Sequence, residues 1–303
     1  MTIDISQMID SPIGVRMAIA LGRAFPRQAG HGFADLVAGQ IARRQASSLV
    51  KAVRANQWVV RGEALDKAAL DRAVLETFQH SARAIFDLYH YINDPQAASR
   101  LIALDSTTQK LLQRPEFDGR GLMIAGLHTS NFDLCLQWMC SQGINLMVLT
   151  IPNPQGGHRV EYEMRKKTGM NLVPASVTTV RQVVKHLQKG GVAMTGIDRP
   201  ILEPEARPRF FGHPAALPMH HIFLAIKAQV PVMIMAVNLQ SDGKYHVTTS
   251  DPIEMDPHFD REAQTLQNAE KVLNIAESFI RIEPQQWSMS LPVWPELLNK
   301  TPY

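Results

Sequence analysis

Length, composition and charge narrow the class of protein before any motif is considered. The chain has 303 residues, of which 45% are hydrophobic, so it is long enough to bury a large core. Its formal charge of +3, without a block of like charges, argues against a nucleic-acid partner. A local contact with anionic phosphates or membrane headgroups still fits this charge.

The cysteines and the hydrophobic stretches indicate the compartment. Cys135 and Cys140 lie five positions apart in one predicted helix, which favours reduced thiols in the cytosol over a disulfide framework. The N-terminus lacks a signal-peptide pattern, and no apolar run is long enough to span a bilayer. We therefore expect a soluble or peripheral protein that faces the cytoplasm.

The first third of the chain has the periodicity of helices. Apolar residues recur at helical spacing over residues 11–25, 31–60 and 66–92. Ser11 and Pro12 are a suitable cap and first-turn pair for the first of these helices. We expect a helical N-terminal portion over residues 1–95.

From residue 121 onward, short apolar runs alternate with helical segments. The predicted strands are residues 121–127, 144–150, 192–197, 230–237 and 244–250, with a further short apolar segment at 171–175. The predicted helices are residues 129–141, 158–169, 177–191, 217–229 and 263–282. Alternation of this kind, with nearly continuous apolar strands, predicts an α/β fold with a mostly parallel central sheet flanked by helices. We read residues 1–303 as a single domain whose α/β catalytic portion covers 115–303.

The stretch GLHTSNFDLC places His128 directly after a predicted strand and Asp133 at the start of the next helix. In parallel sheets, reactive groups collect in the loops beyond the carboxyl ends of the strands. With Thr129 or Ser130 as the helix cap, the imidazole and the carboxylate can meet, so that the carboxylate fixes the tautomer and the other ring nitrogen takes a proton from a hydroxyl. The alternative is a buried core histidine beside an ordinary first-turn acid, and the position at a strand end brings the two interpretations near parity.

The same residues carry a resemblance to a known superfamily. His128, four intervening residues and Asp133 match the His-x4-Asp motif of glycerolipid and lysophospholipid acyltransferases. The sequence segments around the motif resemble those of one branch of the superfamily. This branch contains the bacterial lipid A acyltransferases and the enzymes that acylate phosphatidylinositol mannosides. The matching positions are Asn131 and Phe132 in HTSNFD, then Asp198, Phe210, Phe211 and Gly212 in GIDRPILEPEARPRFFG, and Trp287 in the terminal block. A helical lead-in upstream of the motif completes the order of the blocks.

The resemblance implies transfer of a fatty acyl group from a thioester, either acyl-CoA or acyl carrier protein, to a hydroxyl of a lipid or glycolipid. It implies a glycerolipid acyltransferase-like fold, His128 as general base, Asp133 as its orienting partner, and neither a metal nor another cofactor. The substrate-binding residues that it implies are Asn131, Arg165, Asp198, Arg199, Phe210, Phe211 and Gly212. For Asp198 the alternative is a loop acid paired with Arg199.

Arg165 lies in YEMRKKTGM, which resembles the family block where an arginine precedes a glycine. A guanidinium suits a phosphate of the donor or acceptor. The alternative is a solvated helix face formed with Lys166 and Lys167.

Membrane contact is expected to be peripheral, on the inner face of the bacterial cell membrane. Basic residues of the N-terminal helices, among them Arg43 and Arg44, suit contact with anionic headgroups. The alternative is a layer of helices that serves only to pack against the core.

Two other functions remain open from the sequence. In a thioester hydrolase, His128 and Asp133 would activate water, and in a non-catalytic lipid-binding protein the pair would be a relict. His213, His220 and His221 lack the spacing of a metal site. Phosphate-loop, dinucleotide and Gly-x-Ser-x-Gly motifs are absent from the sequence.

Overall fold

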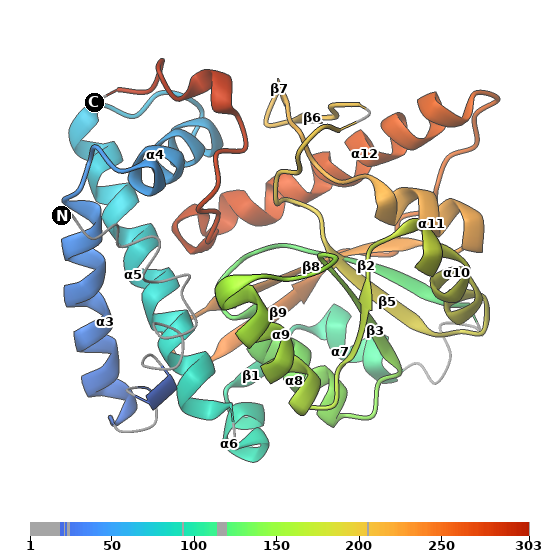
Figure 1. The fold of residues 1–303 in the computed structure, drawn as a ribbon, viewed down its shortest axis with the longest axis horizontal. Helices are drawn as coiled ribbons and strands as arrows, with labels where there is room; N and C mark the ends of the chain where they lie inside the picture. The colour runs from blue at the N-terminus through green and yellow to red at the C-terminus, as the bar shows by residue number, and fades with distance from the viewer. Residues whose placement is uncertain are drawn as a thin grey trace.

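The computed structural model describes residues 19–20, 22, 25–92, 94–113, 120–204 and 206–302. A seven-stranded sheet lies between helices, and a layer of N-terminal helices stands beside it (Figure 1). This arrangement confirms the predicted α/β class. The helix predicted over residues 11–25 lies almost wholly outside the described residues.

Over residues 25–92, the N-terminal layer consists of the helices α3 (Arg27–Ala42), α4 (Ser48–Val60) and α5 (Lys67–Tyr91). Helical spacing over 31–60 predicted an uninterrupted pattern, but the chain leaves the helix after Ala42. Ser47 then caps α4, because its side chain accepts a hydrogen bond from the backbone of Val50. Asp66 caps α5 in the same way.

The central sheet is mostly parallel. The strands β2 (Leu122–Gly126), β3 (Leu146–Thr150), β4 (Asn171–Pro174), β5 (Val192–Gly196) and β8 (Val232–Leu239) are parallel to one another. β9 (Tyr245–Thr249) pairs antiparallel with β8, and β1 (Ile102–Leu104) extends the sheet beyond β9. The order is β1-β9-β8-β2-β5-β3-β4. β2 and β5 are neighbours, so their carboxyl ends lie side by side.

Helices cover both faces of this sheet, as the continuous apolar strands predicted. In β2, Leu122 and Ile124 face one core cluster, whereas Met123 and Ala125 face the other. The helices packed on the first face are α6 (Pro95–Arg100) and α8 (Phe132–Ser141), and those on the second are α10 (Val180–Gln188), α11 (His220–Ala228) and α12 (Arg261–Ile282). Two further helices of the described part are α7 (Ser106–Gln113), beside β9, and α9 (Gly156–Lys167), after β3.

A short hairpin of β6 (Arg209–Phe210) and β7 (His213–Pro214) lies between β5 and α11, against α12 (Figure 1). Phe211 and Gly212 form its turn with φ angles of 49° and 78°. A two-residue turn with positive φ at both positions fits the twist of a hairpin and favours glycine. The FFG block is thus the end of β6 and its turn.

A buried carboxylate holds the N-terminal layer to the sheet. Asp87 of α5 is completely buried and accepts hydrogen bonds from Arg27 (2.8 Å from Nη2), His31 (2.7 Å) and the hydroxyl of Tyr245 (2.7 Å). Burial alone would raise the pKa of Asp87, but the hydrogen bonds and charges of His31 and Arg27 outweigh it and lower the pKa. Asp87 therefore ties α3, α5 and β9 together as an ionised group.

We predict that Asp87→Asn destabilises the protein by about 3 kcal/mol at neutral pH, because it leaves Arg27 without its charge partner. A carboxyl group whose pKa is lowered on folding stabilises the folded state at pH values above its ordinary pKa of 3.8. This contribution is lost as the pH falls through the lower pKa of the folded state. The difference in the free energy of unfolding between wild type and variant, measured by urea unfolding, should therefore be fully present at pH 7 and should decrease below about pH 4.

Asp35→Asn is the matched control, since Asp35 pairs with Arg83 where both side chains are about a third exposed (28% and 32%). That variant should lower the free energy of unfolding by less than about 1 kcal/mol. Equal losses in the two variants would contradict the role given to Asp87.

Candidate functional site

His128 stands at the carboxyl end of β2, two residues beyond the strand. Its ring lies directly over the backbone of β5: a Cβ atom at Gly196 would stand 2.5 Å from Cε1 of the ring. A side chain at position 196 would therefore displace the imidazole. The His128 side chain is 22% exposed, so one part of it remains accessible from outside.

The partner of His128 is Asp198, which follows β5. Nδ1 of the ring lies 2.5 Å from Oδ1 of Asp198, and the backbone N–H of His128 donates to Oδ2 at 2.9 Å. The indole N–H of Trp287 donates to the same Oδ2 at 2.7 Å. A carboxylate that accepts from Nδ1 fixes the tautomer in which Nε2 carries a lone pair.

Asp198 is completely buried, yet the environment favours its charged form. Burial acts to raise its pKa, but the charge and hydrogen bonds of His128, together with the Trp287 hydrogen bond, lower the pKa below the ordinary value. The hydrogen bonds of the Asp198 carboxylate come from His128 and from Trp287. Arg199 follows it directly in the same loop.

Among the described residues, no hydrogen bond or ion pair joins Asp133 to His128, so the expected pairing of these two residues is not seen in the structure. Its carboxylate accepts two hydrogen bonds from Arg165 of α9, 2.7 Å from Nε and 2.9 Å from Nη2. The expectation depended on Thr129 or Ser130 as the cap of α8, but Asn131 is the cap.

The physical reason lies in how residues 129 and 130 are held. The Thr129 hydroxyl accepts from the backbone of Val237, and the backbone of Ser130 donates to the Gln286 carbonyl at 2.9 Å. These bonds attach the turn to β8 and to the C-terminal segment. The first turn of α8 then directs Asp133 toward α9, away from the ring of His128.

Arg165 was predicted to contact a phosphate, and the structure places it in the ion pair with Asp133. Both side chains are largely buried, at 23% and 15% exposure. The ring of Phe132 is near both groups: its centroid is 5.0 Å from that of the His128 ring and 6.0 Å from the Arg165 guanidinium. The pair is therefore adjacent to the site, in contrast to a solvated helix face.

Two other predicted binding residues, Asn131 and Phe210, are buried beneath the site. Asn131 is buried, and its amide donates to the carbonyl of Ala84 in α5 at 2.9 Å. Phe210 is fully buried against Trp287 and Trp294, with ring centroids 6.2 and 5.7 Å away. Asn131 and Phe210 are thus buried side chains, held by α5 and by the aromatic cluster respectively.

Phe211 and Gly212 lie in the turn of the β6–β7 hairpin. The backbone N–H of Phe211 donates to Glu277 at 2.5 Å, and the Arg281 guanidinium packs over the Phe211 ring. These contacts attach the hairpin to α12. They place Gly212 at the hairpin turn, beyond the aromatic cluster around Trp287.

Sequence reasoning missed the part played by the C-terminal segment. Residue 287 forms an antiparallel bridge with Thr129, and the backbone of Ser288 donates to the His128 carbonyl at 2.8 Å. The Ser288 hydroxyl accepts from Ser81 of α5 at 2.9 Å. Trp287 was the one residue of this segment that the sequence singled out, and nothing local in the sequence connects it with Asp198.

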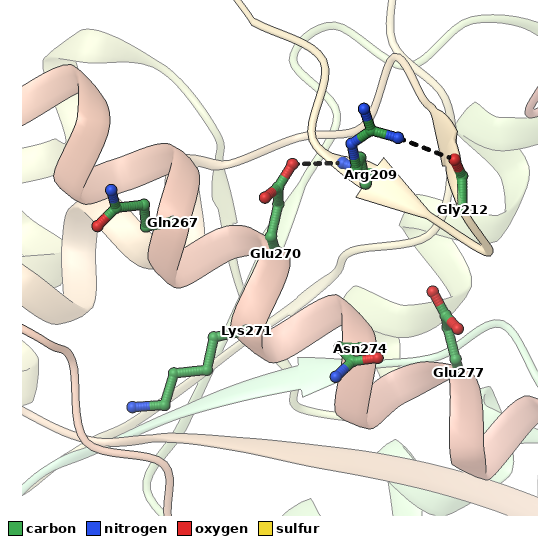
Figure 2. Close-up of a pocket in the computed structure, with 7 residues that line it drawn as sticks. All are labelled: Arg209, Gly212, Gln267, Glu270, Lys271, Asn274 and Glu277. Carbon is green, nitrogen blue, oxygen red and sulfur yellow. Dashed lines mark hydrogen bonds between the residues drawn. The ribbon is translucent and has the colours of Figure 1, made fainter.

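A separate cavity of about 480 Å³ lies between α12 and the β6–β7 hairpin (Figure 2). Its charged groups already have partners: Glu270 accepts from the Arg209 backbone, Glu277 from that of Phe211, and Lys271 donates to Asp256. The residues that line it are Arg209, Gly212, Gln267, Glu270, Lys271, Asn274 and Glu277. This cavity is distinct from the surroundings of His128.

At the start of α11, His221 is buried and His220 is half-buried. His220 is hydrogen-bonded to the Thr195 hydroxyl at 3.0 Å, and burial lowers the pKa of His220 to about 4 and that of His221 to about 3. Within the described ranges, no group of three potential metal ligands is arranged to hold an ion. In the same part of the chain, no helix combines the length and the apolar character needed to cross a bilayer.

The arrangement suits removal of a proton from a hydroxyl. Nε2 of a partly exposed histidine carries a lone pair, a buried carboxylate is hydrogen-bonded to the other ring nitrogen, and a guanidinium lies near Phe132.

A search of curated proteins gave no match to the chain. The family described as bacterial lipid A biosynthesis acyltransferase, however, matches residues 12–295 of the 303. The chain therefore belongs to the bacterial lipid A biosynthesis acyltransferase family and is an acyltransferase.

Proposed function

We propose that this acyltransferase moves a fatty acyl group from acyl-CoA or acyl carrier protein to a hydroxyl of a lipid or glycolipid. It does so as a peripheral protein on the inner face of the bacterial cell membrane. The observation that carries the proposal is the hydrogen bond between Nδ1 of His128 and Asp198, which leaves Nε2 as the proton acceptor. The family match supports acyl transfer to a lipid acceptor.

His128 acts as general base. Nε2 takes the proton of the acceptor hydroxyl while its oxygen attacks the thioester carbonyl carbon, and a tetrahedral intermediate forms. The carbon–sulfur bond then breaks, and the leaving thiolate takes the proton from Nε2, so that a thiol and an ester result. The buried Asp198 carboxylate stabilises the imidazolium during this exchange, in place of the Asp133 partner expected from the sequence.

The oxyanion is stabilised by backbone N–H groups at the start of α8. Of the turn over residues 129–133, Ser130 already donates to Gln286, and His128 before it donates to Asp198. The N–H groups of Phe132 and Asp133 belong to the first turn of α8, where backbone donors have no partner within the helix. We assign them the developing negative charge.

Arg165 binds a phosphate of the donor or acceptor. A guanidinium has five N–H donors, and the contact with Asp133 uses two of them. Asp133 holds the group in one orientation, so that the remaining edge is preorganised for an anion. This role gives the aspartate of the His-x4-Asp motif a task that does not involve the histidine.

We predict that His128→Ala abolishes lipid-dependent release of thiol from palmitoyl-CoA. The measurement is thiol release by the purified protein with and without a total lipid extract, with the labelled acyl chain traced into lipid. Acyl carrier protein is the second donor to be tried. Transfer by His128→Ala at the wild-type rate would eliminate the general base, and His128-dependent release of free fatty acid without lipid would identify a hydrolase. Binding of lipid without turnover of either donor would instead identify a non-catalytic lipid-binding protein.

Asp198→Asn should lower kcat by roughly 10²–10⁴-fold with little change in KM. The Asn amide can donate to Nδ1, which shifts the hydrogen to Nε2 and removes the base. Trp287→Phe, which removes one of the donors to Asp198, should lower kcat by about tenfold. Unchanged kcat in Asp198→Asn would return the orienting role to Asp133.

Arg165→Ala should raise KM for a phosphate-bearing substrate by roughly tenfold, and the effect should weaken at high salt. Because Asp133 acts through Arg165, Asp133→Asn combined with Arg165→Ala should cost no more than Arg165→Ala alone. Additive losses in this double-mutant cycle would show that Asp133 has a separate task. KM values unchanged in Arg165→Ala would contradict phosphate binding.

A further inference from the structure

Large apolar side chains are exposed on the loops that follow three adjacent strands. Ile151 comes directly after β3 and is 46% exposed, Val177 follows β4 and is 91% exposed, and Leu202 follows β5 and is 94% exposed. Ile201, next to Leu202, is 42% exposed. Single exposed apolar residues are ordinary, so it is their common location that calls for an explanation.

That location is the edge of the sheet that carries the site. β2, β5, β3 and β4 are adjacent and parallel, so the residues after each strand meet at one edge. His128 follows β2 and Asp198 follows β5, four residues before Leu202. The exposed apolar side chains therefore form a rim beside the accessible part of His128.

The loops after β3 and β4 carry basic but no acidic residues. Residues 151–159 and 175–185 contain no acidic residue, and the exposed Arg159 and Arg181 lie in the first turns of α9 and α10. Among the described residues 199–204 of the neighbouring loop, Glu203 is acidic and exposed. Apolar side chains flanked by arginines are suited to the boundary between anionic headgroups and acyl chains.

We propose that this rim, formed by Ile151, Val177, Ile201, Leu202, Arg159 and Arg181, docks on a bilayer that contains anionic lipid. The proposal rests on the proposed function and specifies how the acceptor reaches the site. Docking through the rim directs His128 toward the headgroups, so that a lipid hydroxyl meets Nε2 while its acyl chains remain in the bilayer. Val177 and Leu202 enter the boundary region, and the two arginines contact phosphates.

Vesicle co-sedimentation of the full chain tests the proposal, with phosphatidylcholine vesicles either pure or mixed with phosphatidylglycerol. Removing two apolar side chains that enter the bilayer costs their transfer free energy, so Val177→Ser with Leu202→Ser should lower the partition onto mixed vesicles by roughly tenfold or more. Arg159→Gln with Arg181→Gln should lower it by roughly tenfold on mixed vesicles and little on pure phosphatidylcholine.

The matched control is Phe259→Ser. Phe259 is 96% exposed but lies at the opposite edge, since the segment before α12 pairs through Ile253 with Val232, the first residue of β8. Its replacement should leave the partition unchanged. Far-ultraviolet circular dichroism of each variant verifies the fold.

A second apolar surface provides the test that would overturn the proposal. Phe33 and Leu36 are exposed on α3, which packs on the side of α5. Loss of binding in Phe33→Ser with Leu36→Ser, but not in the Val177 and Leu202 variant, would place the docking surface on α3. Equal losses in the Phe259 control would likewise contradict a specific rim.

Docking and catalysis fail separately. His128→Ala should bind vesicles like wild type, since its side chain lies behind the rim. Vesicle binding that depends on the rim, without His128-dependent transfer, would retain the docking surface and remove the proposed function. If transfer depends on His128 but the rim variants bind vesicles like wild type, the proposed function is retained and the docking surface is removed.

Discussion

The buried carboxylate of Asp198 is the group on which the arrangement of the site depends. It is inaccessible to water and accepts hydrogen bonds from the His128 ring, the His128 backbone and the Trp287 indole. An ionised carboxylate without such partners would cost several kcal/mol to bury. Two of the three donors belong to the end of β2 and the third to the C-terminal segment. The charge on Asp198 is therefore stable only when both segments are in place, which couples formation of the site to completion of the fold.

The same segments connect the site to the N-terminal helices. Ser288 bonds the His128 backbone on one side and Ser81 of α5 on the other, and the Asn131 amide reaches the Ala84 carbonyl. α5 is in turn attached to β9 by the buried Asp87. The helical layer is thus more than a cover for the core, because its contacts fix the turn between β2 and α8 and so the orientation of the imidazole.

Much of this fold was predictable from the sequence for a physical reason. Strands buried on both faces are continuous apolar runs, and in a parallel sheet their carboxyl ends meet at one edge. This reasoning placed His128 and Asp198 at the edge that carries the site. It could not reveal β1 or the β6–β7 hairpin, because strands of three and two residues are too short to show a period.

The pairing within the site was beyond sequence reasoning. Nearness along the chain favoured Asp133 as the partner of His128, whereas the observed partner is Asp198, 70 positions further on. Which acid turns toward the ring is decided by Thr129 and Ser130, whose bonds to Val237 and Gln286 rotate the first turn of α8. Such long-range contacts leave no local signal in one sequence. The FFG block shows the same limit: the resemblance implied substrate contact for it, and nothing local in the sequence indicated that Phe211 and Gly212 form a hairpin turn.

The two carboxylates of the site have distinct environments and therefore distinct tasks. Asp198 is completely buried, and its carboxylate is hydrogen-bonded to the His128 ring. Asp133 is partly exposed and holds the Arg165 guanidinium, and the Phe132 ring is near both this ion pair and the His128 ring. Asp133 and Phe132 are consecutive in the first turn of α8, so one helix turn carries both the ring beside His128 and the carboxylate that holds Arg165. Under the proposed function, a substrate with its thioester at His128 and a phosphate at Arg165 would have to span the distance between these two side chains. The His-x4-Asp motif would then position two groups of the substrate, with no contact needed between its own histidine and aspartate.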